Sequence, residues 1–477
     1  MNIQKNKSKV LIIIIVFLLL VVGATFAYVI AQSNKSASSN ANVTAKLLDD
    51  LQFSVDKEIN ISINQFNLAN GGSNVDDTAI ASAKLRANSK TNTASRDYYL
   101  SFNIKSNNYI YTTTEQKPEI ILTIKDPNGQ DITSINSLQY VTVTAADGTI
   151  TKGFDITTAT GLKEIVSNYE IRSNSSTNYT NQDWTFKVTY INLDSDQGEN
   201  EEHTLNAEIT IREYAVLADH IKAQYYGIQG TNNLYYHDST LANGANDNSY
   251  RYAGSSDTTS NYACFGYTDS CNASTTYRII GVFDDKVKLI ANTSSYSFPW
   301  DSSNSNVWET SSINKYLNGS SDSVIVGFKK WQNLIYNAAW QVSGKEYADV
   351  APVTAQTCYN NEIKNPKTNL IYNAKLGLPY VSEYAYAALP SAWTTNINNY
   401  SQNKDILNNN WIFNSGYQWI ITPQASSGGL LIASTGSIGS ANTSLSAQIR
   451  ETFYLNNNVK YKSGDGSVNS PYLIVLD

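Results

Sequence analysis

The sequence is poor in charged residues, in histidine and in cysteine. Charged residues make up only 16% of the 477 residues, against about 25% in an ordinary soluble domain. With 34 basic and 41 acidic residues the net charge is -7, so the chain lacks the basic surface that binding to a nucleic-acid backbone requires. Three histidines and three cysteines leave few of the usual zinc ligands and general bases. We therefore expect no nucleic-acid partner, no metal site and no cofactor, and we assign no catalytic residue.

Apolar and uncharged polar residues are abundant instead. Hydrophobic residues make up 41% of the chain, and tyrosine alone occurs 33 times. This content is enough to fill real cores, which excludes wholesale disorder. A length of 477 residues allows about three domains of ordinary size.

One uncharged apolar run, residues 10–31 (VLIIIIVFLLLVVGATFAYVIA), lies near the start of the chain. As a helix it would be about 33 Å long, enough to cross a hydrocarbon core of about 30 Å. Three lysines precede it and predict an N-terminus inside the cell, with the bulk of the chain outside. Ala27 or Ala31 could instead end a cleaved signal peptide. Residues 1–32 are thus a single-pass membrane anchor or a signal segment, and both export the chain.

The next two regions differ in pattern. Residues 33–46 are polar, Ser- and Asn-rich and without periodicity, which is typical of a flexible stalk. Residues 47–213 then alternate short apolar strands with turns such as DPNG at 126–129. A strand at 204–211 alternates apolar and polar residues and follows the acidic loop 194–202. Several short strands at this spacing predict a β-sandwich domain over residues 47–213.

Periodicity and composition change beyond the β-region. Leu217 and Ile221 recur at helical spacing, so residues 214–255 are predicted as a connecting helix and a linker. Seven of the eight tryptophans and seven of the nine prolines fall after this helix. We expect residues 256–477 to form a second, aromatic-rich α+β domain, with a short helix at 311–317.

A series of motifs in this second region resembles a known family. The motifs are NLYYHD at 233–238, DNSYRYAG at 247–254, YRIIGVF at 277–283, SINKYLNG at 312–319, GLPYVSEYAYA at 377–387 and FYLNNNVKYKSGDG at 453–466. In order and spacing they are similar to an uncharacterised extracellular domain family of bacterial surface proteins. This resemblance covers half of the chain and implies an exported bacterial protein, but no activity.

Two further stretches carry more distant resemblances. Residues 419–455 are similar to C-type-lectin-like domains, including the sulfatase-modifying-enzyme branch, with Arg450 followed by Glu451 where that pattern has proline. This resemblance implies a lectin-like α+β fold for residues 256–477. The late pair of reactive cysteines that sulfatase-modifying enzymes need is missing, so that activity is not implied. The leader segment GATFAY at 23–28 is similar to matrix-fibre and camelysin-type surface proteins.

Cys264 and Cys271 lie seven residues apart on a turn-rich segment. Outside the membrane such a pair suggests a disulfide that closes a small loop and stabilises the fold by about 2–3 kcal/mol. Two free thiols are the alternative. Cys358 is then left unpaired, and no C-x-x-C motif or basic surrounding supports a redox role for it.

Trp300, Asp301 and Trp308 surround a loop rich in serine and asparagine. An exposed ring beside Asp and Asn suits sugar binding, since the ring stacks on apolar C–H faces and the polar groups bond hydroxyls. We therefore take these three residues as candidate ligand-binding residues, with core packing of the tryptophans as the alternative. Glycan binding of this kind should survive high salt and weaken in Trp300→Ala and Trp308→Ala.

Two polar clusters have some of the residues that a metal site needs. His237, Asp238, Asp247 and Asn248 suggest a metal or acid–base cluster, and the alternative is a polar connector whose side chains bond their own backbone. In the acidic loop 194–202 the glycine falls one position early for an EF-hand, which favours a solvated hairpin. Neither cluster is taken as a metal site.

Together these observations predict an exported, membrane-anchored bacterial surface protein, held in the membrane by residues 10–31. Its C-terminal domain is expected to bind a carbohydrate, cell-wall or host-surface ligand. One alternative is a structural subunit of a surface fibre or matrix, which the leader and the β-region suggest. Another is an extracellular hydrolase, because the carboxylate pairs that cleave glycosides meet in space and not in sequence.

Overall fold

The computed structural model describes residues 36–38, 49–64, 73–89, 91–268, 270–294, 296–425 and 428–476. It is mainly β-structure, which confirms the predicted β-rich fold class. The chain divides into two compact units, Met1–Ala215 and Val216–Asp477. The predicted membrane segment and most of the predicted stalk lie outside the described residues. Within the described ranges, no helix combines the length and the apolar character needed to cross a bilayer.

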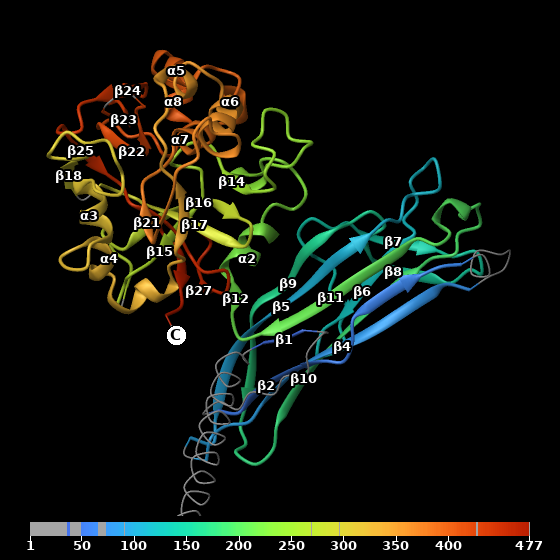
Figure 1. Ribbon diagram of the computed structural model, residues 1–477. Helices are drawn as coiled ribbons and strands as arrows, with labels where there is room; N and C mark the ends of the chain where they lie inside the picture. Colours follow the sequence, from blue (N-terminus) through green and yellow to red (C-terminus); the bar gives the residue numbers. More distant parts are fainter. Residues whose placement is uncertain are drawn as a thin grey trace, which may run out of the picture. The chain divides into compact units, whose positions relative to one another are not determined.

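The first unit is built from two antiparallel sheets (Figure 1). The five-stranded sheet has the order β1 (Ser36–Ser38), β11 (Thr204–Arg212), β5 (Ala94–Asn107) and β9 (Gly161–Ser173), with β3 (Ile59–Ser62) also paired to β11. The six-stranded sheet has the order β2 (Leu51–Val55), β4 (Val75–Leu85), β10 (Thr180–Tyr190), β6 (Ile120–Lys125), β8 (Ile150–Asp155) and β7 (Tyr140–Thr144). The three-residue strand β1 falls within the segment predicted as a stalk.

Strands of both sheets bury their apolar residues in one common core. β11 alternates buried and solvent-facing residues along its length, as a strand with one covered face does. Phe102 of β5 and Phe186 of β10 stack with ring centroids 5.8 Å apart, so they join the two sheets. The buried Trp184 indole donates a hydrogen bond of 2.7 Å to the Tyr98 hydroxyl, which satisfies both polar atoms inside the core. This arrangement fits the predicted sandwich.

The acidic loop 194–202 is fixed to the first unit by a buried carboxylate. Glu119 accepts hydrogen bonds from the Gln197 and Asn200 side chains of this loop, at 2.8 and 2.9 Å. Tyr190 and Thr112 donate to the same carboxylate. The loop's own acidic side chains face solvent.

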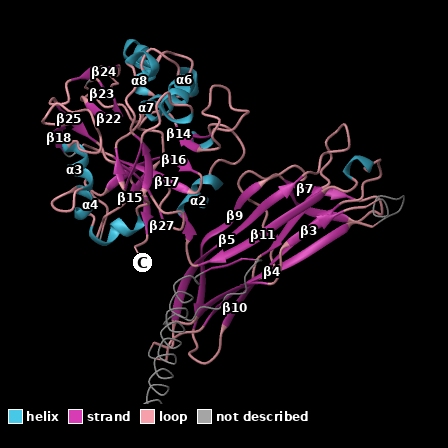
Figure 2. Ribbon diagram, in the orientation of Figure 1, coloured by secondary structure: helices cyan, strands magenta, loops and turns pink. Residues whose placement is uncertain are grey.

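The second unit contains three sheets, with the helices gathered around them (Figure 2). The ten-stranded sheet has the order β12 (Ala215–Val216), β27 (Lys460–Ser463), β28 (Tyr472–Ile474), β15 (Tyr262–Cys264), β16 (Thr276–Phe283), β17 (Lys286–Ala291), β26 (Thr452–Tyr454) and β21 (Leu376–Gly377), with β14 (Tyr250–Tyr252) beside β16 and β13 (Leu234–Tyr236) beside β14. The five-stranded sheet has the order β18 (Tyr296–Pro299), β25 (Ser446–Ile449), β22 (Gln418–Pro423), β23 (Gly429–Ile432) and β24 (Ile438–Ala441). β19 (Ala338–Gln341) and β20 (Ile371–Ala374) form a separate pair.

The helices of the second unit are all short. They are α2 (Leu217–Ala223), α3 (Ser312–Asn318), α4 (Val324–Gly327), α5 (Tyr347–Val350), α6 (Ala355–Tyr359), α7 (Val381–Tyr386) and α8 (Lys404–Asn408). Short 3-10 helices lie at Gly198–Asn200 in the first unit and at Thr231–Asn233, Lys329–Leu334, Pro390–Ala392 and Ile397–Gln402 in the second, and a π-turn lies at Asn360–Lys364. Unpaired backbone groups at such short helices need caps, and the Ser311 side chain accepts from Asn314 N at the start of α3.

The structure corrects the prediction that residues 214–255 connect the two domains. The helix is present as α2, but it and the strands that follow belong to the second unit. β13 pairs with β14, and β14 pairs with β16, so this segment extends the ten-stranded sheet. Strands of three residues are too short to show a period of two, which is why this stretch reads as a linker in the sequence.

Charged side chains lie inside the second unit and are paired there. Lys288 of β17 donates to Glu383 of α7 at 2.5 Å, and both side chains are buried. The Lys288 ammonium also lies over the rings of Trp340, Tyr380 and Tyr454, at 4.7 to 4.9 Å from their centroids. Such cation–π contacts replace part of the hydration that the ammonium loses on burial. This pair ties the ten-stranded sheet to α7.

Candidate functional site: an aromatic cleft around Glu451

The predicted binding tryptophans are buried. Trp300 is 0% exposed and Trp308 is 1% exposed. Their rings pack edge to face, with centroids 5.4 Å apart, and Trp300 packs in the same way against Trp419 at 5.9 Å. Rings enclosed by other rings offer no face to a sugar, so the structure corrects this prediction in favour of core packing.

Asp301 organises a loop and is not available to a ligand. Its carboxylate accepts hydrogen bonds from the backbone N–H groups of Ser303, Ser305 and Ser312, at 2.7 to 3.2 Å. Burial works against the ionised form, but the N–H groups of Ser305, Ser303 and Ser312 hold the pKa of Asp301 below its ordinary value. The loop that follows Trp300 is thereby closed onto the start of α3.

The cluster around His237 is also structural. The His237 ring is buried, accepts a hydrogen bond of 3.0 Å from Ala245 N at Nδ1 and packs edge-on against Tyr386. Burial, with the field of Arg251, lowers the pKa of His237 well below its ordinary value, so the ring stays neutral. Asp247 pairs with Arg251 at 2.5 Å. Among the described residues, no three His, Cys, Asp or Glu side chains converge to hold a metal ion.

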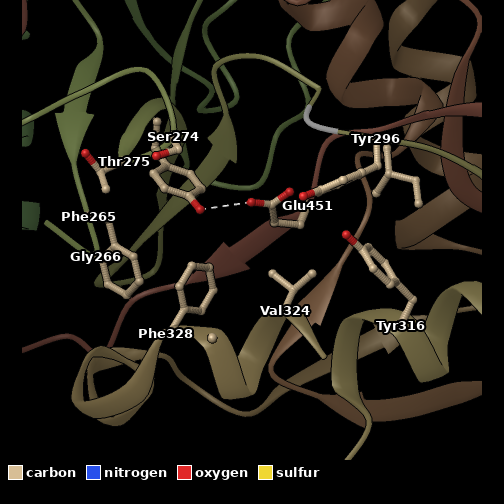
Figure 3. Close-up of a pocket in the computed structure, with 12 residues that line it drawn as sticks. Phe265, Gly266, Ser274, Thr275, Tyr296, Tyr316, Val324, Phe328 and Glu451 are labelled. Carbon is tan, nitrogen blue, oxygen red and sulfur yellow. Dashed lines mark hydrogen bonds between the residues drawn. The ribbon is translucent and has the colours of Figure 1, made fainter. Parts of the chain in front are cut away.

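A cleft elsewhere in the second unit brings together aromatic rings and a carboxyl group, the kinds of side chain that the sequence analysis associates with sugar binding (Figure 3). Its volume is about 290 Å³. The lining residues are five aromatic side chains, one carboxyl group and small or aliphatic residues, namely Phe265, Gly266, Ser274, Thr275, Tyr277, Tyr296, Tyr316, Val324, Gly327, Phe328, Ile449 and Glu451. We call this feature the Glu451 cleft.

Glu451 lies where the chain passes from one sheet to the other. β25 of the five-stranded sheet ends at Ile449 and β26 of the ten-stranded sheet begins at Thr452. Arg450 and Glu451 form the connection, and the Arg450 guanidinium donates to the backbone carbonyls of Ala291 and Ile412. The carboxyl of Glu451 instead faces the cleft (Figure 3).

Among the described side chains, the Tyr277 hydroxyl donates a hydrogen bond of 2.9 Å to Oε1 of Glu451. Burial raises the pKa of Glu451, although its own backbone N–H, the Tyr277 hydrogen bond and the charge of Arg450 favour the ionised form. Burial and the neighbouring carboxyl likewise raise the pKa of Tyr277 well above its ordinary value, so its hydroxyl remains a donor. A carboxyl with a raised pKa in a cleft is a mark of functional sites.

Two tyrosines form the outer wall of the cleft. Tyr296 on β18 is 64% exposed, and Tyr316 on α3 is half-buried. Their ring centroids are 6.2 Å apart in an edge-to-face arrangement. Phe298 stacks on Tyr316 at 4.9 Å and fixes the orientation of that ring. One side of the cleft is therefore an aromatic surface that solvent reaches.

A disulfide closes the opposite wall. Cys264 at the end of β15 is bonded to Cys271, and Cys358 is a buried free thiol. The segment between β15 and β16 supplies Phe265, Gly266, Ser274 and Thr275 to the lining. The disulfide thus holds the loop that shapes this wall.

The sequence interpretation missed the Glu451 cleft for a definite reason. Its lining comes from the β15–β16 loop, β16, β18, α3, α4 with the residue that follows it, β25 and the β25–β26 connection, and no motif joins residues so far apart. One signal was present: Glu451 stands where the lectin-like pattern has proline. No family model matches the chain, and no curated protein matches it.

Proposed function

We propose that this protein is an exported, membrane-anchored surface protein whose second unit binds a glycan-type ligand in the Glu451 cleft. The apolar run at 10–31, preceded by lysines, supports export and anchoring. The bonded cysteine pair suits an oxidising, extracellular setting. In this proposal the first unit is a β-sandwich that spaces the binding unit from the membrane, and the second unit is a lectin-like α+β domain.

The observation that carries the proposal is the convergence of aromatic rings and one carboxyl in a single open cleft. Aromatic faces bind the apolar C–H faces of a sugar ring, and a carboxylate orients polar groups of the ligand. A volume of about 290 Å³ lies near the lower end of ligand sites and suits one sugar-sized group. Hydrolysis by a carboxylate pair finds less support here, because Glu451 is the one acid among the lining residues.

A glycan panel tests this proposal directly. The full chain in detergent micelles is titrated with cell-wall polysaccharide fragments and simple sugars, and binding is measured by calorimetry at low and high salt. Tyr316→Ala should weaken binding about tenfold, since a ring at the centre of a binding site is worth about 1–2 kcal/mol. Tyr336→Ala removes another exposed tyrosine, outside the lining, and should leave affinity unchanged. Equal affinity in Tyr316→Ala and the unaltered protein would contradict the proposal.

A further inference from the structure

We propose that the part of the ligand that enters the Glu451 cleft is a cation, an ammonium or alkylammonium group. This inference rests on the proposed binding function and names the chemistry of the ligand. It follows from the charge, the rings and the hydrogen-bonding capacity of the lining.

The lining of twelve residues holds one acidic side chain and no basic one. The nearest arginine in sequence, Arg450, directs its guanidinium N–H groups to the carbonyls of Ala291 and Ile412, at 2.7 and 2.9 Å. Tyr277 supplies a neutral donor to Oε1 of Glu451. An ionised Glu451 therefore faces the cleft without a cation among the lining side chains, and a ligand cation would complete the pair.

The rings add to this preference. Of the five rings that line the cleft, Phe265 and Tyr277 are buried against other rings, so the rings within reach of solvent are Tyr296, Tyr316 and Phe328. An aromatic face attracts a cation through its quadrupole. Phe328 gives a hydroxylated ligand no hydrogen bond, but its partly exposed ring adds attraction for a cation. Rings around a carboxylate are the combination by which proteins recognise alkylammonium groups.

On the wall that the disulfide loop forms, the serine and threonine hydroxyl groups are occupied within the protein. The Ser274 hydroxyl donates to Asn272 Oδ1 at 2.7 Å. Thr275 Oγ1 accepts from Asn272 N at 2.9 Å and donates to Asn272 O at 3.3 Å. A neutral polyol would find few partners on this wall, whereas an alkylammonium group needs only the carboxylate and the rings.

Paired ligands that differ in charge but hardly in shape test the inference. The full chain in detergent micelles is titrated with choline and with 3,3-dimethylbutan-1-ol, its neutral carbon analogue, and separately with glucosamine and glucose. Choline and glucosamine should bind at least ten times more tightly than their neutral counterparts. Equal affinity within both pairs would overturn the inference.

Variants separate this inference from the function on which it rests. Glu451→Gln keeps an acceptor for Tyr277 and should abolish the preference for the charged ligand of each pair. Glu309→Gln removes an exposed carboxyl outside the lining, and should preserve that preference. Tyr316→Leu keeps the carboxyl and removes a ring, and it should weaken choline binding about tenfold. Melting temperatures show whether each variant is folded.

The outcomes are distinguishable. A neutral glycan that binds, loses affinity in Tyr316→Ala and is unaffected by Glu451→Gln would refute the inference and leave the proposed function standing. If the ligands bind and no cleft variant changes their affinity, both the inference and the proposed function are refuted. A preference for choline that persists in a folded Glu451→Gln protein would refute the role of the carboxylate.

Discussion

At the scale of single residues, three acids show how surroundings decide what a carboxyl group does. Glu119 accepts hydrogen bonds from several side chains and anchors a loop. Glu383 is paired with Lys288 inside the core. Glu451 accepts a hydrogen bond from Tyr277. Of these three acids, Glu451 is the one that borders a cleft.

The pH dependence of stability should report on Glu451 directly. Burial raises its pKa above the ordinary value of 4.5, so between these two pKa values the folded protein holds a proton that the unfolded chain has lost. The stability contributed by this proton is fully present below the unfolded-state pKa and is lost as the pH rises through the folded-state pKa. Glu451→Gln cannot ionise, so its Tm should rise relative to the unaltered protein as the pH increases from the unfolded-state pKa through the folded-state pKa of Glu451.

Thermal melts of both proteins at matched ionic strength measure this difference. Burial also raises the pKa of Glu362, but Glu362 is present in both proteins and cancels in the comparison. A Tm difference that stays constant or shrinks as the pH rises would contradict the prediction.

The buried tryptophans should matter for stability and not for binding. Trp308→Ala removes a ring enclosed by the core, and such a change lowers the free energy of unfolding by about 3–5 kcal/mol. Urea denaturation measures the loss, and titration at a temperature where the variant is folded should give unchanged affinity. Normal stability with reduced affinity would restore Trp308 as a binding residue.

Removing one partner of the Lys288–Glu383 pair should do more harm than removing both. Lys288→Met leaves a buried carboxylate without its cation and should lower the free energy of unfolding by about 3–5 kcal/mol. The double variant Lys288→Met/Glu383→Gln should recover most of this loss, because no uncompensated charge then remains in the core. Denaturation curves of the two variants measure the free energy of unfolding of each. An equal loss in both would show that the ion pair itself supplies the stability.

At the scale of elements, the loop between β15 and β16 combines a structural bond with a cleft wall. Peptide mapping without reductant should find Cys264 joined to Cys271 and Cys358 free. The Cys264→Ser/Cys271→Ser protein should lose about 2–3 kcal/mol of stability. Affinity in the cleft should fall as well, since the loop supplies four lining residues. A bridge that contains Cys358 would overturn this pairing.

Elements with a long regular pattern are those that the sequence predicts well. The predicted strand at 204–211 corresponds to β11 (Thr204–Arg212), because every second residue is apolar and buried. The predicted helix at 311–317 corresponds to α3 (Ser312–Asn318). β13 and β14 are missed, because three residues carry no readable period. Only the pairing of β13 with β14 and of β14 with β16 makes them strands.

The candidate site was less accessible to sequence reasoning. An excess of aromatic residues in the second half is visible, but composition does not tell an enclosed ring from an exposed one. Trp300 is enclosed because Trp308 and Trp419 pack around it, whereas Tyr296 lies on an edge strand and stays open. Glu451 gains its role from a connection between two sheets, and that connection exists only in three dimensions.

At the scale of the whole molecule, the export proposal predicts where the chain can be cut. Protease added to intact cells should digest residues 33–477, because the lysines that precede the apolar run favour an N-terminus inside the cell. Immunoblotting before and after cell lysis measures the protected fraction. Protection of the bulk of the chain in intact cells would contradict export.

The order of strands in the ten-stranded sheet has a mechanical consequence. β12, at the start of the second unit, is linked to β26, next to Glu451, through the successive neighbours β27, β28, β15, β16 and β17. If the protein is tethered through its N-terminus and holds a ligand in the cleft, tension between cell and ligand crosses the sheet from strand to strand. This tension would load the hydrogen bonds between neighbouring strands. Strands of two or three residues, such as β12 and β28, make the fewest of these bonds, so their pairing would set the force at which the second unit unfolds and releases the ligand.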